Sequence, residues 1–140
     1  MIDFFVIQEV NEVNSKVTPD DVTQTYDYLS GEGWVMDFHI TGSVYICDPP
    51  VLETDLDYVV RVLDIKSVKQ VLQADGWKVG GSKIGKDFTA FRKGKVNLIC
   101  TQNEEFYKNY IIATQSCKKL NLLDKQDRIK LFDAIIYKKF

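Results

Sequence analysis

The chain has 140 residues, a formal net charge of −2, 45% hydrophobic residues and 12% aromatic residues. This apolar content suffices for one hydrophobic core, so we expect a single domain spanning residues 1–140. No apolar run is long enough to cross a bilayer, and the first ten residues carry acids where a signal peptide carries bases. We therefore expect a cytoplasmic protein without a membrane partner.

The cysteines and the charge distribution narrow the class of protein further. Cys47, Cys100 and Cys117 show neither CxxC nor Cys/His spacing, which indicates reduced core thiols rather than a disulfide framework or a zinc site. The mildly acidic chain argues against broad nucleic-acid binding. From Lys118 onward, however, there are seven bases against three acids. This basic segment is either a solvated helix surface or a face that meets a phosphate-bearing substrate.

The N-terminal part predicts two helices. Residues 1–16 suit either a strand or a helix, and the helical spacing of their valines favours a helix. Thr18 then predicts an N-cap, because Pro19 fits the first helical position and two acids follow it. Gly31 or Gly33 would end this second helix. Its core-facing stripe is predicted to be Val22, Tyr26 and Leu29.

The next segment predicts a strand and a turn. Residues 34–40 alternate as a strand does and lead into Thr41-Gly42-Ser43. His39 precedes the turn, and we interpret it as a strand residue rather than a catalytic group. Residues 44–54 contain Pro49-Pro50, which cannot continue a central strand, so we expect a loop beside a site.

Two aspartates mark the following strand, residues 54–60. Side chains alternate between the faces of a strand, so Asp55 and Asp57 share one face. Adjacent carboxylates repel unless a cation lies between them, and oxygen ligands favour Mg²⁺ or Mn²⁺. Gly42 lets the backbone approach a ligand closely, and the turn N–H groups with the Ser43 hydroxyl can receive phosphate oxygens. The two motifs together predict a metal site for a phosphate-bearing ligand.

The remaining elements are predicted from caps and alternation. Asp64 would cap a helix that Gly76 ends, with Val68, Val71 and Leu72 facing the core. Residues 77–79 predict a short strand, residues 80–82 a Gly-Gly-Ser turn, and residues 88–101 a hairpin around Lys93-Gly94.

Two helices are predicted to complete the chain. Asn103 caps the first, and its core face would hold Phe106, Tyr110, Ala113 and Cys117. Asp124 caps the second, with Ile129, Phe132 and Ile136 facing inward.

The Gly-Ser turn followed by Asp-hydrophobic-Asp on a strand resembles the signature of the nucleotidyltransferase superfamily related to DNA polymerase β. Within it, residues 40–60 and 91–114 look most like small bacteriophage-encoded nucleotidyltransferase-like proteins. The resemblance covers roughly residues 34–136. It implies an α/β (α+β) fold, in which a small mixed sheet is backed by helices as a minimal nucleotidyltransferase core with C-terminal helices.

The resemblance also implies a reaction, the transfer of a nucleoside monophosphate from an NTP, such as ATP, to a hydroxyl acceptor. Asp55 and Asp57 would be catalytic and would hold Mg²⁺ or Mn²⁺. Asn97 takes the place of the usual third carboxylate. The nucleotide-binding residues would be Gly42 and Ser43, on the β and γ phosphates, with Arg92 or Lys95 neutralising triphosphate charge.

Two alternatives stay open from the sequence. The neutral Asn97 and the small size suit a catalytically silent factor of phage origin that binds a nucleotide or a host protein and acts in the host cytoplasm. The basic residues Lys119, Lys125 and Arg128 suit a transferase acting on RNA, including tRNA. The sequence leaves open whether the acceptor is RNA or protein, which NTP is preferred, and the oligomeric state.

Overall fold

The structure is a computed structural model that describes residues 16–80 and 87–138. Within these residues a five-stranded sheet has the strand order β2-β3-β6-β5-β4. Its strands are β2 (Val35–Thr41), β3 (Leu56–Val62), β4 (Lys78–Gly80), β5 (Thr89–Lys93) and β6 (Val96–Thr101). The helices are α1 (Pro19–Gly31), α2 (Ser43–Ile46), α3 (Ile65–Ala74), α4 (Glu104–Lys119) and α5 (Lys125–Tyr137). Because β3 and β6 are parallel while the other pairs are antiparallel, the sheet is mixed and the predicted α/β class is confirmed.

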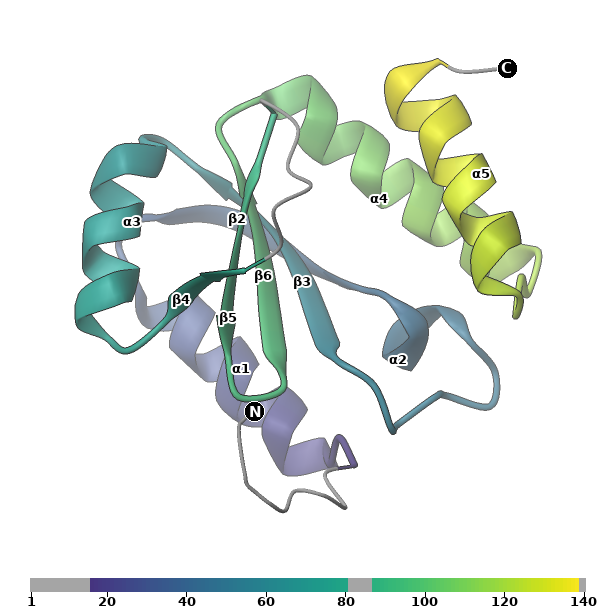
Figure 1. The fold of residues 1–140 in the computed structure, drawn as a ribbon, viewed down its shortest axis with the longest axis horizontal. Coiled ribbons are helices and arrows are strands. Elements are labelled where there is room, and N and C mark those ends of the chain that lie inside the picture. Colours follow the sequence, from purple (N-terminus) through teal and green to yellow (C-terminus); the bar gives the residue numbers. More distant parts are fainter. Residues whose placement is uncertain (1–15, 81–86, 139–140) are drawn as a thin grey trace.

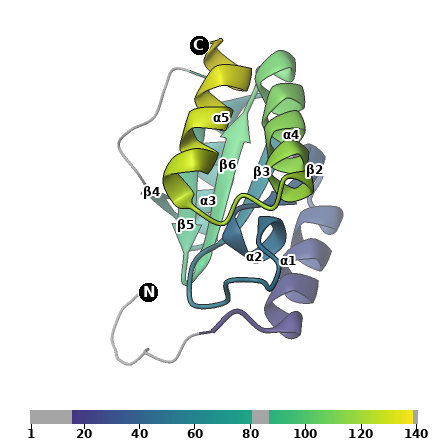
Figure 2. The same cartoon turned by 90° about the vertical axis from the view of Figure 1, so that its right-hand side faces the viewer.

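The helices form a layer on each side of the sheet. Helices α1 and α3 lie on one side, and α4 and α5 lie together on the other (Figures 1 and 2). The larger apolar cluster lies under α1 and α3, where Leu29 and Leu72 pack against Tyr58 and Val60. The smaller cluster lies under α4 and consists of Val59, Ile99, Phe106 and Tyr107. The α4 side therefore has less apolar filling than the α1 side.

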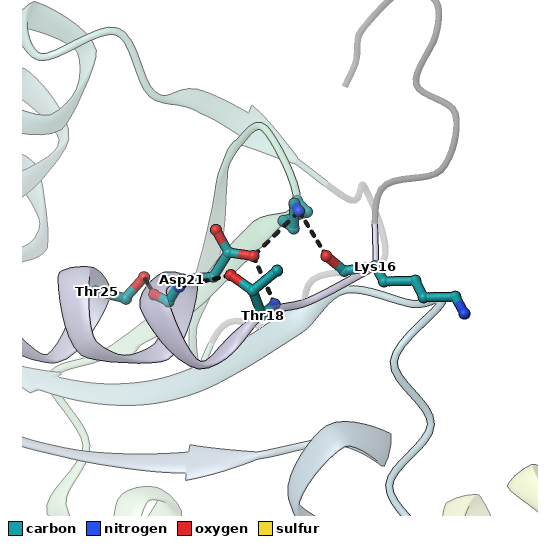
Figure 3. Close-up of polar contacts among 5 residues, drawn as sticks. Lys16, Thr18, Asp21 and Thr25 are labelled. Atoms are coloured by element: carbon teal, nitrogen blue, oxygen red, sulfur yellow. Dashed lines mark hydrogen bonds and ion pairs between the residues drawn. The ribbon is translucent and has the colours of Figure 1, made fainter.

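Four predicted helix starts are confirmed by their caps. At α1, the Thr18 Oγ1 accepts the Asp21 N–H at 3.2 Å and the Asp21 Oδ2 accepts the Thr18 N–H at 2.8 Å, which is a complete capping box (Figure 3). The side chains of Asp64, Asn103 and Asp124 each accept a backbone N–H in the first turn of α3, α4 and α5. Caps of this kind stabilise a helix by about 1 kcal/mol each.

The predicted core faces are right for some positions and wrong for others. Tyr26 is 56% exposed and packs edge to face on Phe38, while Thr25 is buried in its place. Thr25 tolerates burial because its hydroxyl donates to the Asp21 carbonyl at 2.9 Å. Val71 and Ile129 are also exposed, because each lies at the margin of its helix's apolar stripe rather than at its centre.

The other predicted features have mixed outcomes. The short strand begins at Lys78, and the preceding Trp77 is buried and stacks on Tyr28. The cysteines at positions 47, 100 and 117 are free and buried, as expected. The predicted N-terminal helix in residues 1–15 and most of the Gly-Gly-Ser turn lie outside the described residues. Each helix of the described part is too short or too polar to cross a lipid bilayer.

Candidate functional site

The turn between β2 and α2 brings Gly42 against Asp57. Gly42 has φ +79° and is the N-cap of α2, a single helical turn that begins the segment predicted as a loop. A Cβ atom at this position would collide with the Asp57 Oδ2. Glycine is therefore required both by the positive φ and by the close approach. We expected the backbone to approach a ligand here, but the structure shows that the close neighbour is the Asp57 carboxylate itself.

The two aspartates lie together but have different partners. Asp57, on β3, is opposite Asn97 on β6, and the Asn97 Nδ2 donates to the Asp57 Oδ1 at 3.2 Å. Asp55, just before β3, accepts two hydrogen bonds from Arg92, at 2.7 Å from Nη1 and 2.9 Å from Nη2. Asp55 is thus neutralised by a bidentate ion pair, while the side-chain donor to Asp57 among the described residues is a neutral amide.

A row of polar residues crosses the whole described sheet at this level. The strand pairings align Thr41 with Asp57, Asp57 with Asn97, Asn97 with Arg92, and Arg92 with Lys78. Each strand thus contributes one member, and we call this set the polar row. The predicted position of Asn97 beside the aspartate strand is therefore observed.

A cavity of about 280 Å³ opens above Asp57 on the α4 side of the sheet. Its polar lining comes from the ends of β2 and β3 and from α4 and α5. Its apolar wall comes from α2 and α5. The lining residues are Thr41, Gly42, Ser43, Ile46, Thr54, Asp55, Asp57, Tyr110, Lys125, Arg128, Ile129 and Phe132.

The environment of Asp57 disfavours its negative charge. Burial, and next the charge of Asp55, raise the pKa of Asp57 to about 7. The hydrogen bond from Asn97 and the charges of Arg92 and Lys125 lower this pKa but do not cancel the rise. Burial, with a smaller contribution from the Asp57 charge, also raises the pKa of the nearby Tyr110 hydroxyl. The cavity floor therefore holds a carboxylate that lacks a sufficient counter-charge.

Helix α5 supplies the basic side of the cavity, through Lys125 and Arg128. The Arg128 Nη2 donates to the Ser43 Oγ at 2.9 Å, and its Nη1 donates to the carbonyls of Leu122 at 3.0 Å and Leu123 at 2.8 Å. Arg128 thereby joins α2 to the turn before α5. The sequence analysis assigned both residues to a basic segment that could meet a phosphate-bearing substrate or RNA, but it did not place them beside the aspartates. It missed Tyr110 and Phe132 as lining residues because their helical spacing indicates core packing.

The structure does not bring Lys95 to this cavity. Its ammonium group contacts the Asp21 Oδ2 at 3.1 Å and the Lys16 carbonyl at 3.0 Å, at the start of α1. Arg92 and Asn97 do not line the cavity either, but both contact its aspartates. His39 binds the Ile40 carbonyl at 2.6 Å and lies outside the lining, which agrees with its interpretation as a strand residue.

The residues present suit a magnesium ion that a ligand helps to hold. In the described part of the chain, no three His, Cys, Asp or Glu side chains are grouped closely enough to hold one metal. Asp55 and Asp57 are two oxygen donors on one cavity, and Mg²⁺ is commonly held by one or two carboxylates with the remaining positions filled by water and phosphate. The donor set therefore fits Mg²⁺ or Mn²⁺ bound together with a phosphate-bearing ligand, and not a closed structural metal site.

The comparisons with known proteins bear on the fold alone. The sequence matches no protein-family model and no curated protein. The fold is similar to the crystal structure of the conserved protein GrpB from Enterococcus faecalis, with a TM-score of 0.57 and 12% sequence identity, over 88% of this chain and 96% of that chain.

This structural likeness is to GrpB and not to a nucleotidyltransferase, so the resemblance to that superfamily, and to its small bacteriophage members, is wrong. The motif that suggested it is short, and its glycine has a local explanation. Gly42 is required here by its positive φ and by the Asp57 carboxylate, whatever the family.

Proposed function

We propose that this cavity binds a nucleoside triphosphate together with Mg²⁺ or Mn²⁺ and transfers its nucleoside monophosphate to a hydroxyl acceptor on RNA or protein, in the cytoplasm. The observation that carries the proposal is the Asp57 carboxylate on the cavity floor, beside Asp55 and without a sufficient counter-charge. A divalent cation between the two aspartates would relieve both the burial of the charge and the repulsion. The proposal rests on this geometry and not on a family relationship.

The polar lining suits the phosphates of such a ligand. Lys125 and Arg128 are the cations of the lining and stand on α5, and Ser43 begins α2 between β2 and the acidic floor. Arg128 is oriented by two carbonyls and by Ser43, so its guanidinium is held in place before a ligand arrives. Preorganised donors of this kind bind phosphate oxygens with little loss of side-chain entropy.

The apolar wall suits the nucleobase. The side of the cavity formed by α2 and α5 is lined by Ile46, Ile129 and Phe132. The Tyr110 ring packs edge to face on Phe132, and the two ring centroids are 5.0 Å apart. Small-molecule sites commonly combine an apolar wall with a few placed polar groups. Here the two parts lie on the same cavity, so a ligand with a planar apolar end and an anionic end fits both.

The reaction would form a bond between the acceptor oxygen and the α-phosphorus and would break the bond from that phosphorus to the oxygen that bridges to the β-phosphate. Pyrophosphate would leave, and the proton of the acceptor hydroxyl would pass to solvent. The bound cation would supply Lewis-acid stabilisation of the phosphoryl oxygens. Asp55 and Asp57 would hold it, while Lys125 and Arg128 would offset the charge that builds on the leaving pyrophosphate. Ile129 and Phe132 would limit access of water to the reacting phosphorus.

A second function is favoured by Asn97. This amide stands beside Asp57 where a third carboxylate could take the proton of an acceptor hydroxyl, and a neutral amide cannot do so. A regulatory protein that binds the nucleotide, or another protein, without transferring the nucleotide would not need that base. The two functions share the cavity and differ only in whether pyrophosphate is released.

Isothermal titration of each of the four NTPs with Mg²⁺ tests the shared step. We expect binding to the wild type and its loss in the Asp55→Asn/Asp57→Asn double variant. Asp37→Asn is the matched control, since Asp37 is an exposed aspartate paired with Arg61 and outside the cavity lining. Pyrophosphate release, measured on the same samples with RNA and protein acceptors, separates the transferase from the regulator. Absence of binding to every NTP would contradict both.

A further inference from the structure

We propose that Arg92 is a latch on Asp55: its guanidinium holds the carboxylate that a divalent cation must take, so the Arg92–Asp55 pair opens whenever the cation binds. This inference rests on the proposed function and adds a control step to the same site. Arg92 thus has a role beyond neutralising phosphate, namely to compete with the metal for Asp55.

The pair occupies both oxygens of Asp55. Nη1 of Arg92 lies 2.7 Å from Oδ1 and Nη2 lies 2.9 Å from Oδ2, so the contact is bidentate. A carboxylate that binds guanidinium in this way presents both oxygens to the cationic side chain. Because a guanidinium and Mg²⁺ repel each other, the cation and Arg92 compete for Asp55.

The neighbouring aspartate shows what the latch changes. Within residues 16–80 and 87–138, Asp57 has no such partner, and its hydrogen-bond donor is the neutral amide of Asn97. Asp55 is therefore paired with a cationic side chain before any ligand arrives, whereas Asp57 faces only an uncharged donor. Of the two carboxylates, Asp55 is therefore the one that must lose an existing partner.

Arg92 is placed so that it can leave. The side chains of Arg92 and Asp55 are 41% and 43% exposed, so water reaches both sides of the pair. Arg92 stands on β5 in the polar row, and its side chain lies against Gly80 on β4, where a Cβ atom would already be 3.4 Å from the Arg92 Cβ. Opening the pair thus moves one half-exposed side chain and leaves the strand pairing intact.

A released Arg92 remains next to the site. It is held one strand from Asn97 and two strands from Asp57, so its charge stays within reach of a phosphate bound at the cavity mouth. The cation binds Asp55, and the anionic ligand binds Arg92. Each ligand therefore removes the side chain that competes with the binding of the other ligand. Such a pair couples the two binding events, and the coupling is reciprocal.

The test measures binding of Mn²⁺ alone, followed by the electron paramagnetic resonance of free Mn²⁺, without nucleotide. We expect Arg92→Gln to tighten Mn²⁺ binding by about five- to tenfold, because Asp55 is freed. Arg92→Lys keeps the charge but loses the bidentate contact, so its effect should lie between wild type and Arg92→Gln, and it serves as a second variant if Arg92→Gln folds poorly.

Three controls separate the latch from simpler effects. Lys125→Gln removes the same charge from the cavity lining without touching the pair, so its effect on Mn²⁺ binding should be clearly smaller. Arg61→Gln removes an arginine that pairs with Asp37 at 2.6 Å outside the cavity, and should leave Mn²⁺ binding unchanged. Asp57→Asn, in wild type and in Arg92→Gln, should abolish the binding and so locate it.

The possible failures can be told apart. If wild type binds Mn²⁺ through Asp57 but Arg92→Gln binds it equally or more weakly, the latch is wrong and the proposed metal site stands. An equal gain from Lys125→Gln would also overturn the latch, because local charge alone would explain it. If neither wild type nor Arg92→Gln binds Mn²⁺, the proposed function and the latch fall together.

Discussion

The two faces of strand β3 carry different kinds of chemistry. On the side of α1 and α3, Tyr58, Val60 and Val62 are at most 2% exposed and belong to the larger core cluster. On the side of α4 and α5, the same strand presents Asp57 and Arg61, and Val59 between them belongs to the smaller cluster. Because strand side chains alternate, one short segment contributes to the core on one face and lines the proposed binding cavity on the other. Substitutions on the two faces should therefore have separable effects.

The largest expected effect on stability is on the α1/α3 face. Leu72 of α3 is fully buried in the larger cluster, so Leu72→Ala should lower the free energy of unfolding by about 2–5 kcal/mol. Urea denaturation measures this loss, and nucleotide affinity of the folded fraction should stay unchanged. Val71→Ala, at an exposed neighbouring position, is the control and should change stability by less than about 0.5 kcal/mol. A fall in nucleotide affinity similar to that of the Asp55/Asp57 double variant would refute the separation of the two faces.

A smaller effect is expected where the two roles meet, at Gly42. Gly42→Ala forces a side chain into a positive φ and against the Asp57 carboxylate, and should destabilise the fold by about 1–3 kcal/mol. It should also weaken Mg²⁺-dependent nucleotide binding, since Asp57 has to move. Gly31→Ala is the matched control, because an added Cβ there meets nothing within 4 Å. Thermal unfolding and nucleotide titration of both variants decide the point, and unchanged affinity in Gly42→Ala would count against a role of Asp57 in binding.

The remaining expected effect has the opposite sign and lies on the α4/α5 face. The raised pKa of Asp57 means that the folded protein holds this proton more tightly than the unfolded chain, so Asp57 costs stability as the pH rises from about 4 to about 7. Without metal, Asp57→Asn should be more stable than wild type above pH 7, by up to about 4 kcal/mol, and the difference should shrink toward pH 4. Melting temperatures across this pH range measure it.

Added Mg²⁺ should make wild type more stable than Asp57→Asn, which is the reverse of the order without metal. Added Mg²⁺ should stabilise wild type but not Asp57→Asn, and chelation with EDTA should restore the metal-free difference. If the melting temperatures of metal-free wild type and Asp57→Asn change with pH in the same way, the charge of Asp57 is already compensated within the folded protein. A Mg²⁺ effect of equal size in both would place the metal elsewhere.

The local parts of the fold could be predicted from the sequence because they depend on neighbouring residues. Thr18, Asp64, Asn103 and Asp124 each cap a helix within three residues of themselves. The alternation of residues 54–60 likewise predicts that Asp55 and Asp57 share a face, and both line one cavity. These rules need no knowledge of strand order.

The remaining parts of the site depend on contacts between distant segments. Arg92 and Lys95 flank the same hairpin turn, and the sequence does not distinguish them. The pairing of β5 with β6 places Arg92 in the polar row beside Asp55, while Lys95 contacts Asp21 at the start of α1. Helix α5 has no fully buried residue, so its apolar pattern does not reveal which side faces the cavity. The resemblance to the nucleotidyltransferase superfamily was wrong because it rested on short local patterns, which carry no information on how distant segments pack together.

The polar row also limits how the chain can change in length. Its members come from five separate strands, and they align only because each strand keeps its register with the next. Inserting or deleting one residue within β3 or β6 before the row would turn Asp57 or Asn97 to the opposite face and bring an apolar neighbour into its place. Insertions in the segment between α2 and β3 leave these registers untouched. Related sequences that keep this site should therefore vary in their loops and hold the lengths of their strands constant.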